Sequence, residues 1–104
     1  MFDEIVEQHL QYLIDSAEEF ASAQSSSKYY DRFLKTVESK HFLEAQGTID
    51  QRKSIARTHP EYLQALEDAK DVDYQQALLY AKREYAKLSI STWQSRVKEH
   101  SRTM

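Results

Sequence analysis

Residues 47–60 read GTIDQRKSIARTHP and contain both the one glycine and the one proline of this 104-residue chain. Gly47 suits the left-handed backbone position just past the end of a helix. Thr48 and Gln51 have the spacing of a capping box, so a new helix should begin at Thr48. Proline disfavours helix at the residue before it and suits the first position of a helix, so Pro60 should separate this short helix from the next.

Before this stretch, two runs of side chains follow a 4-3-4-3 type of spacing, which places each run on one helix face. They are Val6, Leu10, Leu13, Ala17 and Phe20, and then Tyr30, Leu34, Val37 and His41. The serine-rich residues 21–27 lie between the two runs. Serine is unfavourable inside a helix because its hydroxyl competes for backbone hydrogen bonds. We therefore expect a long helix over 2–45 with a weak seam, a kink or a break at 21–27, the alternative being a linker there.

After this stretch, the segment from Pro60 predicts a long helix with two neighbouring apolar stripes. The stripes are Tyr74, Leu78, Ala81, Tyr85 and Leu88, and then Ala86, Ile90, Trp93 and Val97. Their combined face is wider than one neighbouring helix covers, and Trp and Tyr are favoured at binding hot spots. We therefore expect a face for a protein partner or for self-association, formed by Leu78, Tyr85, Ile90, Trp93 and Val97.

The charged residues form four blocks of alternating sign. Residues 1–27 hold six acids and no Lys or Arg, residues 28–58 have a net charge of +3, residues 59–79 of -4 and residues 80–104 of +4. If the chain folds back at 47–59, blocks of opposite sign lie together. Each exposed pair contributes only a few tenths of a kcal/mol, but the blocks together can select orientation and register. The same pattern also supports an antiparallel dimer.

These patterns predict an all-α fold with one domain over 1–104 and helices at 2–45, 48–58 and 60–101. We expect a long antiparallel, coiled-coil-like helical hairpin with the short helix at its tip. A chain this short buries a limited core, and oligomerisation is a common way to bury more surface. We therefore expect the hairpin to self-associate.

The composition excludes several classes of function. The chain has no cysteine, which excludes disulfides, thiolate-zinc sites and cysteine nucleophiles. One glycine leaves no glycine-rich phosphate loop or nucleotide fingerprint, and no catalytic triad is indicated by spacing. No apolar run approaches the roughly 20 residues that cross a membrane. We therefore expect no enzyme activity, no catalytic residues, no cofactor and no membrane partner.

The four histidines, His9, His41, His59 and His100, show no metal-binding spacing of the HExxH type. A fold-back could bring His41 near His59. However, His41 fits a position in the helix seam and His59 fits a helix start. The sequence therefore predicts no metal site.

Two basic clusters are candidates for contacts with nucleic acid: Arg52, Lys53 and Arg57, and then Lys82, Arg83 and Lys87. Tyr80 and Tyr85 accompany the second cluster, and aromatic rings beside bases can stack on single strands. The alternative is that the tyrosines lie in the helix seam and the bases face the acidic N-terminal block. We favour this alternative, because a net charge of -3 also argues against a dedicated nucleic-acid binder.

Part of the chain resembles a family of small helical phage and prophage proteins. The resemblance covers roughly residues 40–97. It rests on Phe42-Leu43-Glu44-Ala45-Gln46-Gly47-Thr48, Arg52-Lys53, Ala56, His59-Pro60-Glu61-Tyr62, Ile90 and Trp93. Genes of this family tend to lie in early regions with recombination and single-strand-binding functions. The resemblance implies a role beside phage DNA recombination or replication in the cytoplasm of a bacterial host, and it assigns no functional residue.

We therefore predict a non-enzymatic accessory protein of phage type that binds a protein partner in DNA recombination or replication. One alternative is an accessory protein that binds or anneals single-stranded nucleic acid. Another is an inhibitor of a host nuclease or defence complex, a role typical of small early phage proteins.

Overall fold

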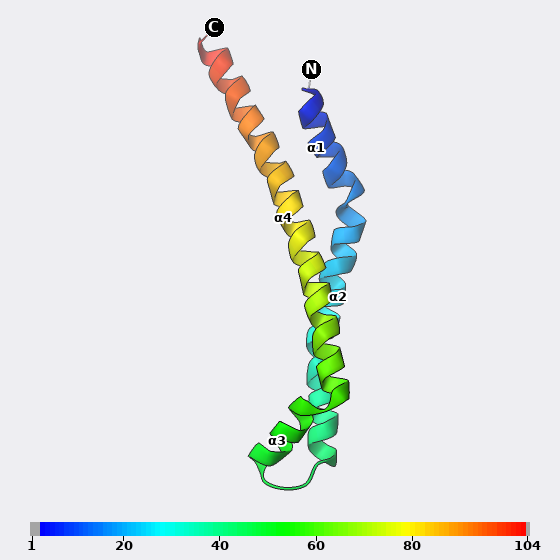
Figure 1. The fold of residues 1–104 in the computed structure, drawn as a ribbon. Coiled ribbons are helices and arrows are strands. Elements are labelled where there is room, and N and C mark those ends of the chain that lie inside the picture. Colours follow the sequence, from blue (N-terminus) through cyan, green and yellow to red (C-terminus); the bar gives the residue numbers. More distant parts are fainter. Residues whose placement is uncertain (1–2, 104) are drawn as a thin grey trace. The chain divides into compact units, whose positions relative to one another are not determined.

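The structure, a computed structural model, describes residues 3–103 and confirms the predicted all-α class. Its four helices are α1 (Glu4–Asp15), α2 (Ala17–Glu44), α3 (Ile49–Thr58) and α4 (Pro60–Thr103) (Figure 1). In this part of the chain, no helix combines the length and the apolar character that crossing a bilayer requires.

The predicted ends of the short helix α3 are confirmed. Gly47 has a positive φ of 122°, a conformation that favours glycine. The Thr48 hydroxyl accepts a hydrogen bond from the Gln51 N–H at 3.2 Å, and the Gln51 side chain accepts one from the Thr48 N–H at 2.9 Å. This capping box satisfies two backbone donors that a helix start would otherwise leave unbonded. Short-range chemistry therefore sets both the turn and the helix start.

The first long segment is interrupted at Ser16, whereas α2 runs on through 21–27 without the break or linker predicted there. The Arg83 guanidinium enters at this point, where its Nη1 donates to the Leu13 carbonyl and to the Ser16 hydroxyl, each at 2.7 Å. In an unbroken helix the Leu13 carbonyl would accept from the N–H of Ala17. A side chain inserted into this ladder of hydrogen bonds is a known cause of helix interruption.

The serine-rich residues 21–27 lie inside α2. Ala23, Ser26 and Ser27 are half-buried there, and the Ser27 hydroxyl donates to the Asp73 carboxylate at 2.6 Å. Packing against a neighbouring helix stabilises a helix more than intrinsic propensity does. The small serine side chains therefore suit a closely packed helix face, which outweighs their poor propensity.

The chain divides into two compact units, and unit 2 is Ser22–Gln76. Within unit 2, residues of α2 pair with residues of α4 in opposite order along the chain. Ser27 bonds Asp73, and Lys40 lies 3.4 Å from Glu61. The two helix segments of this unit therefore pack antiparallel.

Unit 1 combines the described residues up to Ala21 with those from Ala77 onward. The rings of His9 and Tyr85 pack edge-to-face with centroids 5.6 Å apart, and the ring centroids of Phe20 and Tyr80 are 6.4 Å apart. His9 precedes Phe20 in the chain, but its partner Tyr85 follows Tyr80, the partner of Phe20. The packing within unit 1 is therefore antiparallel too.

The buried core consists mostly of small side chains. Its apolar members are Val6, Val37, Ala56, Ala65, Ala69, Leu79 and Ala86. Ser16 is also buried while Ala17 is exposed, so the expected seam position at Ala17 is wrong by one residue. The interruption at Ser16 explains this shift, because it changes which residues face α4.

Candidate functional site

On α4, one set of side chains packs inside unit 1 and a second set stays exposed. We call the packed positions the inner stripe: Leu79, Arg83, Ala86, Ile90 and Trp93, all buried or half-buried. We call the exposed positions the outer stripe: Leu78, Ala81, Tyr85 and Leu88. Successive helix residues lie about 100° apart around the axis, so the outer stripe points away from the inner one.

The outer stripe is a strongly exposed apolar surface. Tyr85 is 67% exposed and Leu88 is 65% exposed, whereas Ala86 between them is 1% exposed. Ala86 is the small residue at the centre of the inner stripe and allows close approach of the helices there, while Tyr85 and Leu88 on either side stay exposed. Unit 1 therefore buries Ala86 and leaves the nearby large residues Tyr85 and Leu88 exposed on the same helix.

A groove between α1 and α4 adjoins the outer stripe. Its apolar lining includes Ile5, Val6, Tyr85, Leu88 and Trp93. Ile5 is exposed, and Trp93 is half-buried on the inner stripe. The outer stripe and this groove together form an apolar surface to which both helices contribute.

The predicted partner face is divided between these surfaces. Leu78, Tyr85 and Val97 are exposed, while Ile90 and Trp93 are half-buried. Both stripes were predicted to form one wide face, because spacing alone does not tell which stripe packs within the chain. The hydrogen bonds of Arg83 to Leu13 and Ser16 identify the stripe that contains Ala86 as the packed one.

The charge blocks leave many exposed charges in unit 1. Within residues 3–103, no Lys or Arg after Gln76 forms an ion pair with an acid before Ser22. The ion pair of Lys87 joins it to Glu84 on its own helix, at 3.1 Å. Exposed charges of both signs, such as Glu18 and Lys82, are therefore still available to another molecule.

Arg52 and Arg57, two of the candidate nucleic-acid contacts in unit 2, make contacts within the chain. The Arg52 guanidinium lies 4.1 Å from the centre of the Phe42 ring, and its Nε donates to the Phe42 carbonyl at 3.1 Å. Arg57 donates to the Glu38 carboxylate at 2.9 Å. These contacts tie α3 to α2, while Lys53 between them is exposed.

The second basic cluster lies in unit 1, and its members Lys82, Arg83 and Lys87 differ in exposure. Arg83 is half-buried with its guanidinium bonded to α1, whereas Lys82 is exposed. Lys87 pairs with Glu84. Of this cluster, Lys82 therefore offers an exposed base without a polar contact among the described residues.

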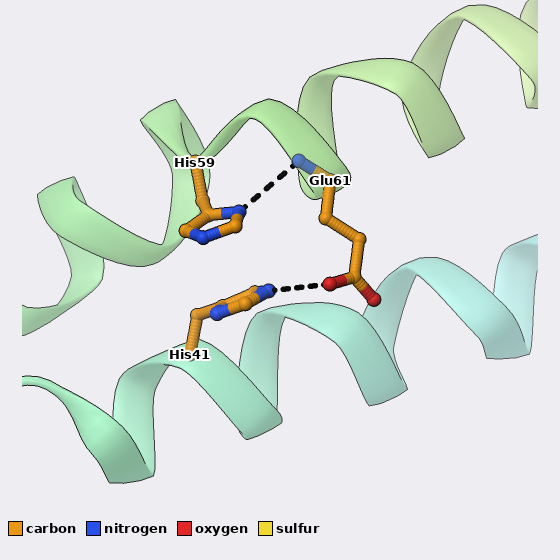
Figure 2. Close-up of side chains that lie close together, drawn as sticks. All are labelled: His41, His59 and Glu61. Carbon is orange, nitrogen blue, oxygen red and sulfur yellow. Dashed lines mark hydrogen bonds and ion pairs between the residues drawn. The ribbon is translucent and has the colours of Figure 1, made fainter.

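A polar cluster lies in unit 2, where α2 ends and α4 begins (Figure 2). The rings of His41 and His59 are stacked, with centroids 3.5 Å apart and planes inclined by 15°. His41 Nε2 lies 3.1 Å from Glu61 Oε2. The Glu61 backbone N–H donates to His59 Nδ1 at 3.1 Å, so His59 caps the start of α4 with its ring nitrogen.

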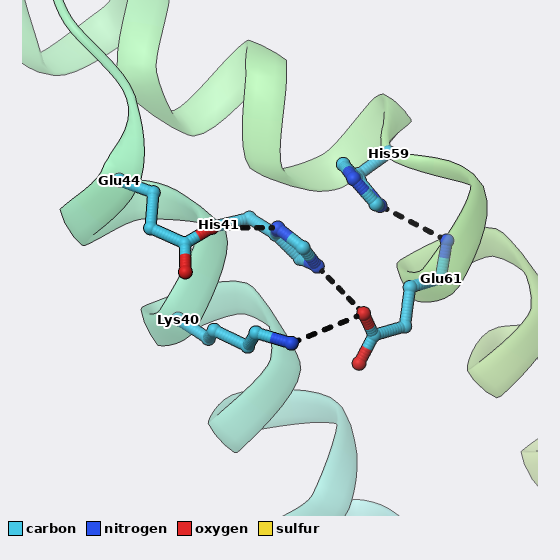
Figure 3. A network of polar contacts seen from close by, with 5 residues as sticks. All are labelled: Lys40, His41, Glu44, His59 and Glu61. Atoms are coloured by element: carbon cyan, nitrogen blue, oxygen red, sulfur yellow. Dashed lines mark hydrogen bonds and ion pairs between the residues drawn. The ribbon is translucent and has the colours of Figure 1, made fainter.

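Two further charged residues complete this cluster (Figure 3). Lys40 Nζ lies 3.4 Å from Glu61 Oε2, and Glu44 Oε2 lies 3.7 Å from His41 Nδ1. The hydrogen bond from His41 holds the pKa of Glu61 below its ordinary value, and the Lys40 charge acts in the same direction. His41 itself is buried, with 7% of its surface exposed.

The predicted seam position of His41 and helix-start position of His59 agree with this geometry. Glu61 is the member that the sequence analysis missed. It lies twenty residues from His41, and no local spacing links residues so far apart. The available signal was the fold-back at residues 47–60, which brings the end of one helix beside the start of the next.

The chain was also compared with known proteins, and no family model, no curated protein and no solved structure matched it.

Proposed function

We propose that this chain is a non-enzymatic binding protein that works as an oligomer, with the outer stripe as the surface on which a second copy docks. The observation that carries this proposal is the exposure of Tyr85 and Leu88 beside the buried Ala86 on one helix. Regularly spaced large apolar residues on a helix face are typical of a surface that packs against another helix.

The charges favour a second copy as the occupant. The first 27 residues hold six acids and no Lys or Arg, and bases predominate after residue 79. In the pair that we propose, the acidic segment of each copy lies against bases of α4 of the other, such as the exposed Lys82. A two-fold interface is self-complementary in this way. Each copy then forms the same favourable contacts.

We also propose that each copy is a long antiparallel, coiled-coil-like hairpin. The antiparallel packing inside each unit supports this arrangement. The 4-3 spacing of buried and half-buried positions continues along α4 from Tyr62 to Trp93, as expected for a helix that packs along most of its length.

In this proposal the oligomer acts by binding a protein partner in phage DNA recombination or replication. The support for this process is the resemblance over residues 40–97 to small phage and prophage proteins. Inhibition of a host nuclease or defence complex is the alternative role that the same resemblance suggests.

Binding or annealing of single-stranded nucleic acid is the second candidate function. Exposed Lys53 and Lys82 favour it, whereas the intrachain contacts of Arg52, Arg57 and Arg83 weigh against it. A fluorescent single strand titrated at about 50 mM salt tests this function, because phosphate contacts are strongest at low salt. Absence of binding under these conditions removes this candidate.

The docking of a second copy is tested by measuring the solution mass across a range of protein concentrations. We expect the wild-type chain to form a dimer or larger oligomer, and the double variant Tyr85→Glu, Leu88→Glu to be a monomer with unchanged helicity. Leu43→Glu is the matched control, because Leu43 is exposed on α2 in unit 2. It should leave the mass unchanged.

Two outcomes contradict the docking proposal. The first is a wild-type chain that stays monomeric at about 100 µM, since helix-mediated dimers of useful affinity form well below this concentration. The second is a double variant with the wild-type mass. In the first case the outer stripe serves a different protein, and in the second the copies associate elsewhere.

A further inference from the structure

We propose that His41, His59 and Glu61 bind one divalent transition-metal ion of the class to which Zn²⁺ belongs. One ligand atom from each of these residues lies within 4.8 Å of the other two. Imidazole nitrogens together with a carboxylate oxygen suit Zn²⁺ and its neighbours, whereas Mg²⁺ and Ca²⁺ prefer oxygen ligands alone. This site lies in unit 2 and is independent of the docking surface in unit 1.

The separation of two ligand atoms already fits a bound ion. His41 Nε2 and Glu61 Oε2 are 3.1 Å apart. Two ligands of a tetrahedral zinc ion, each about 2.0–2.2 Å from the metal, lie roughly 3.3–3.5 Å from one another. Because a carboxylate only accepts hydrogen bonds, the short contact places a proton on Nε2, and the ion would replace that proton.

Glu44 supplies the outer partner that metal-bound histidines usually have. Its carboxylate lies 3.7 Å from His41 Nδ1, the ring nitrogen opposite to the one that faces Glu61. If this carboxylate moves into hydrogen-bond range, it can accept from Nδ1 and so leave Nε2 as the metal ligand. Glu44 and Glu61 lie on opposite sides of the His41 ring (Figure 3), so an ion at Nε2 would leave Nδ1 facing Glu44.

One side of the site is buried and the other is open to solvent. His41 is 7% exposed and His59 is half-buried. The Glu61 side chain is 42% exposed, so an ion could enter from its side and keep water as a further ligand. The ion would link the last turns of α2 to the start of α4, the two helix ends that α3 connects within unit 2.

Two existing contacts must change when the ion binds. His59 Nδ1 now accepts from the Glu61 N–H, and its ring is stacked on that of His41, so the His59 ring must turn to direct a nitrogen at the ion. Lys40 lies 3.4 Å from Glu61 Oε2 and competes with the cation for this oxygen. Removing the Lys40 charge should therefore strengthen metal binding, whereas a purely structural cluster predicts no such gain.

The test is calorimetric titration of the untagged full chain with ZnCl₂, with MgCl₂ as a second titrant. We expect one Zn²⁺ per chain and no heat of binding for Mg²⁺. His59→Gln and Glu61→Gln should each weaken Zn²⁺ binding by more than about 10-fold, the smallest loss typical of an outer partner. Glu44→Gln should weaken it by about 10–100-fold. Lys40→Met should tighten it.

His100→Gln is the matched control for general binding by histidine, because His100 lies near the end of α4 in unit 1. It should keep the wild-type stoichiometry and affinity. Circular dichroism without metal verifies that each variant is folded. If His59→Gln unfolds, the test still rests on the variants of Glu61 and Lys40, because substitution of exposed side chains should not disturb the fold. Unchanged Zn²⁺ affinity in Glu61→Gln, or loss of binding in His100→Gln, overturns the proposal.

Discussion

Arg83 shows how one side chain can change the course of a helix. It occupies a position of the inner stripe, where its guanidinium bonds α1 and lies 5.3 Å from the centre of the Phe20 ring. A charged group inside a helix interface must have its hydrogen bonds satisfied, because leaving them unmade costs several kcal/mol. The Leu13 carbonyl and the Ser16 hydroxyl satisfy them at the place where the first helix is interrupted.

Glu61 provides a prediction at the same scale. Its folded-state pKa is lowered by the hydrogen bond from His41 and by Lys40. A carboxyl with a lowered pKa stabilises the fold fully above its unfolded value, near pH 4.3, and loses this contribution as the pH falls through the lowered folded value. The stability difference between wild type and Glu61→Gln should therefore be largest at neutral pH and shrink toward pH 3.

This difference is measured by urea unfolding at pH 7, 5 and 3 in the presence of EDTA, which keeps metal out of the comparison. Equal differences at pH 7 and pH 3 would show that ionised Glu61 does not contribute to stability.

At the scale of elements, the interruption between α1 and α2 depends on Arg83 in our interpretation. Arg83→Met removes the group that occupies the Leu13 carbonyl, so this carbonyl can accept from the Ala17 N–H as in a continuous helix. We expect the Ala17 amide to exchange more slowly with solvent in Arg83→Met than in wild type. The loss of the charge-assisted bonds should also lower stability by about 1.5–3 kcal/mol.

Lys82→Met is the control for this experiment, because Lys82 is the exposed neighbour of Arg83 on α4. It should leave both the Ala17 exchange rate and the stability close to wild type. An Ala17 amide that exchanges equally fast in wild type and Arg83→Met would indicate that the backbone at Ser16 is interrupted for another reason.

At the scale of the whole molecule, the distribution of apolar side chains is the main finding. No large side chain is fully buried among residues 3–103, and the apolar core consists mostly of alanine and valine. Alanine buries much less apolar surface than leucine or tyrosine, so each copy gains little hydrophobic stabilisation alone. Burial of the outer stripe against a second copy would add the missing contribution.

Trp93 gives a test of where such an interface ends. It lines the groove beside Tyr85 and Leu88 while also packing on the inner stripe. If it belongs to the interface as a hot spot, Trp93→Ala should weaken association by roughly 2 kcal/mol, about 30-fold in the dissociation constant. Sedimentation at several concentrations measures this. An unchanged constant together with lower unfolding stability would assign Trp93 to the packing of unit 1 alone.

The sequence by itself determined the features that depend on neighbouring residues. Gly47, Thr48, Gln51 and Pro60 act within a few residues of one another, so the bounds of α3 and the all-helical class could be read directly. The 4-3 spacing likewise identified both apolar stripes of α4. These signals are local, because helix capping and helix periodicity are properties of short segments.

Only the tertiary structure decided which stripe packs, where the first helix is interrupted and which polar groups meet. Ala86 is buried while its neighbour Tyr85 is exposed, and spacing along the chain does not distinguish the two. The interruption at Ser16 needs Arg83, and the histidine cluster needs Glu61 opposite His41. Each depends on atoms far apart in the sequence that come within a few ångströms after folding, and no spacing along the chain encodes such contacts.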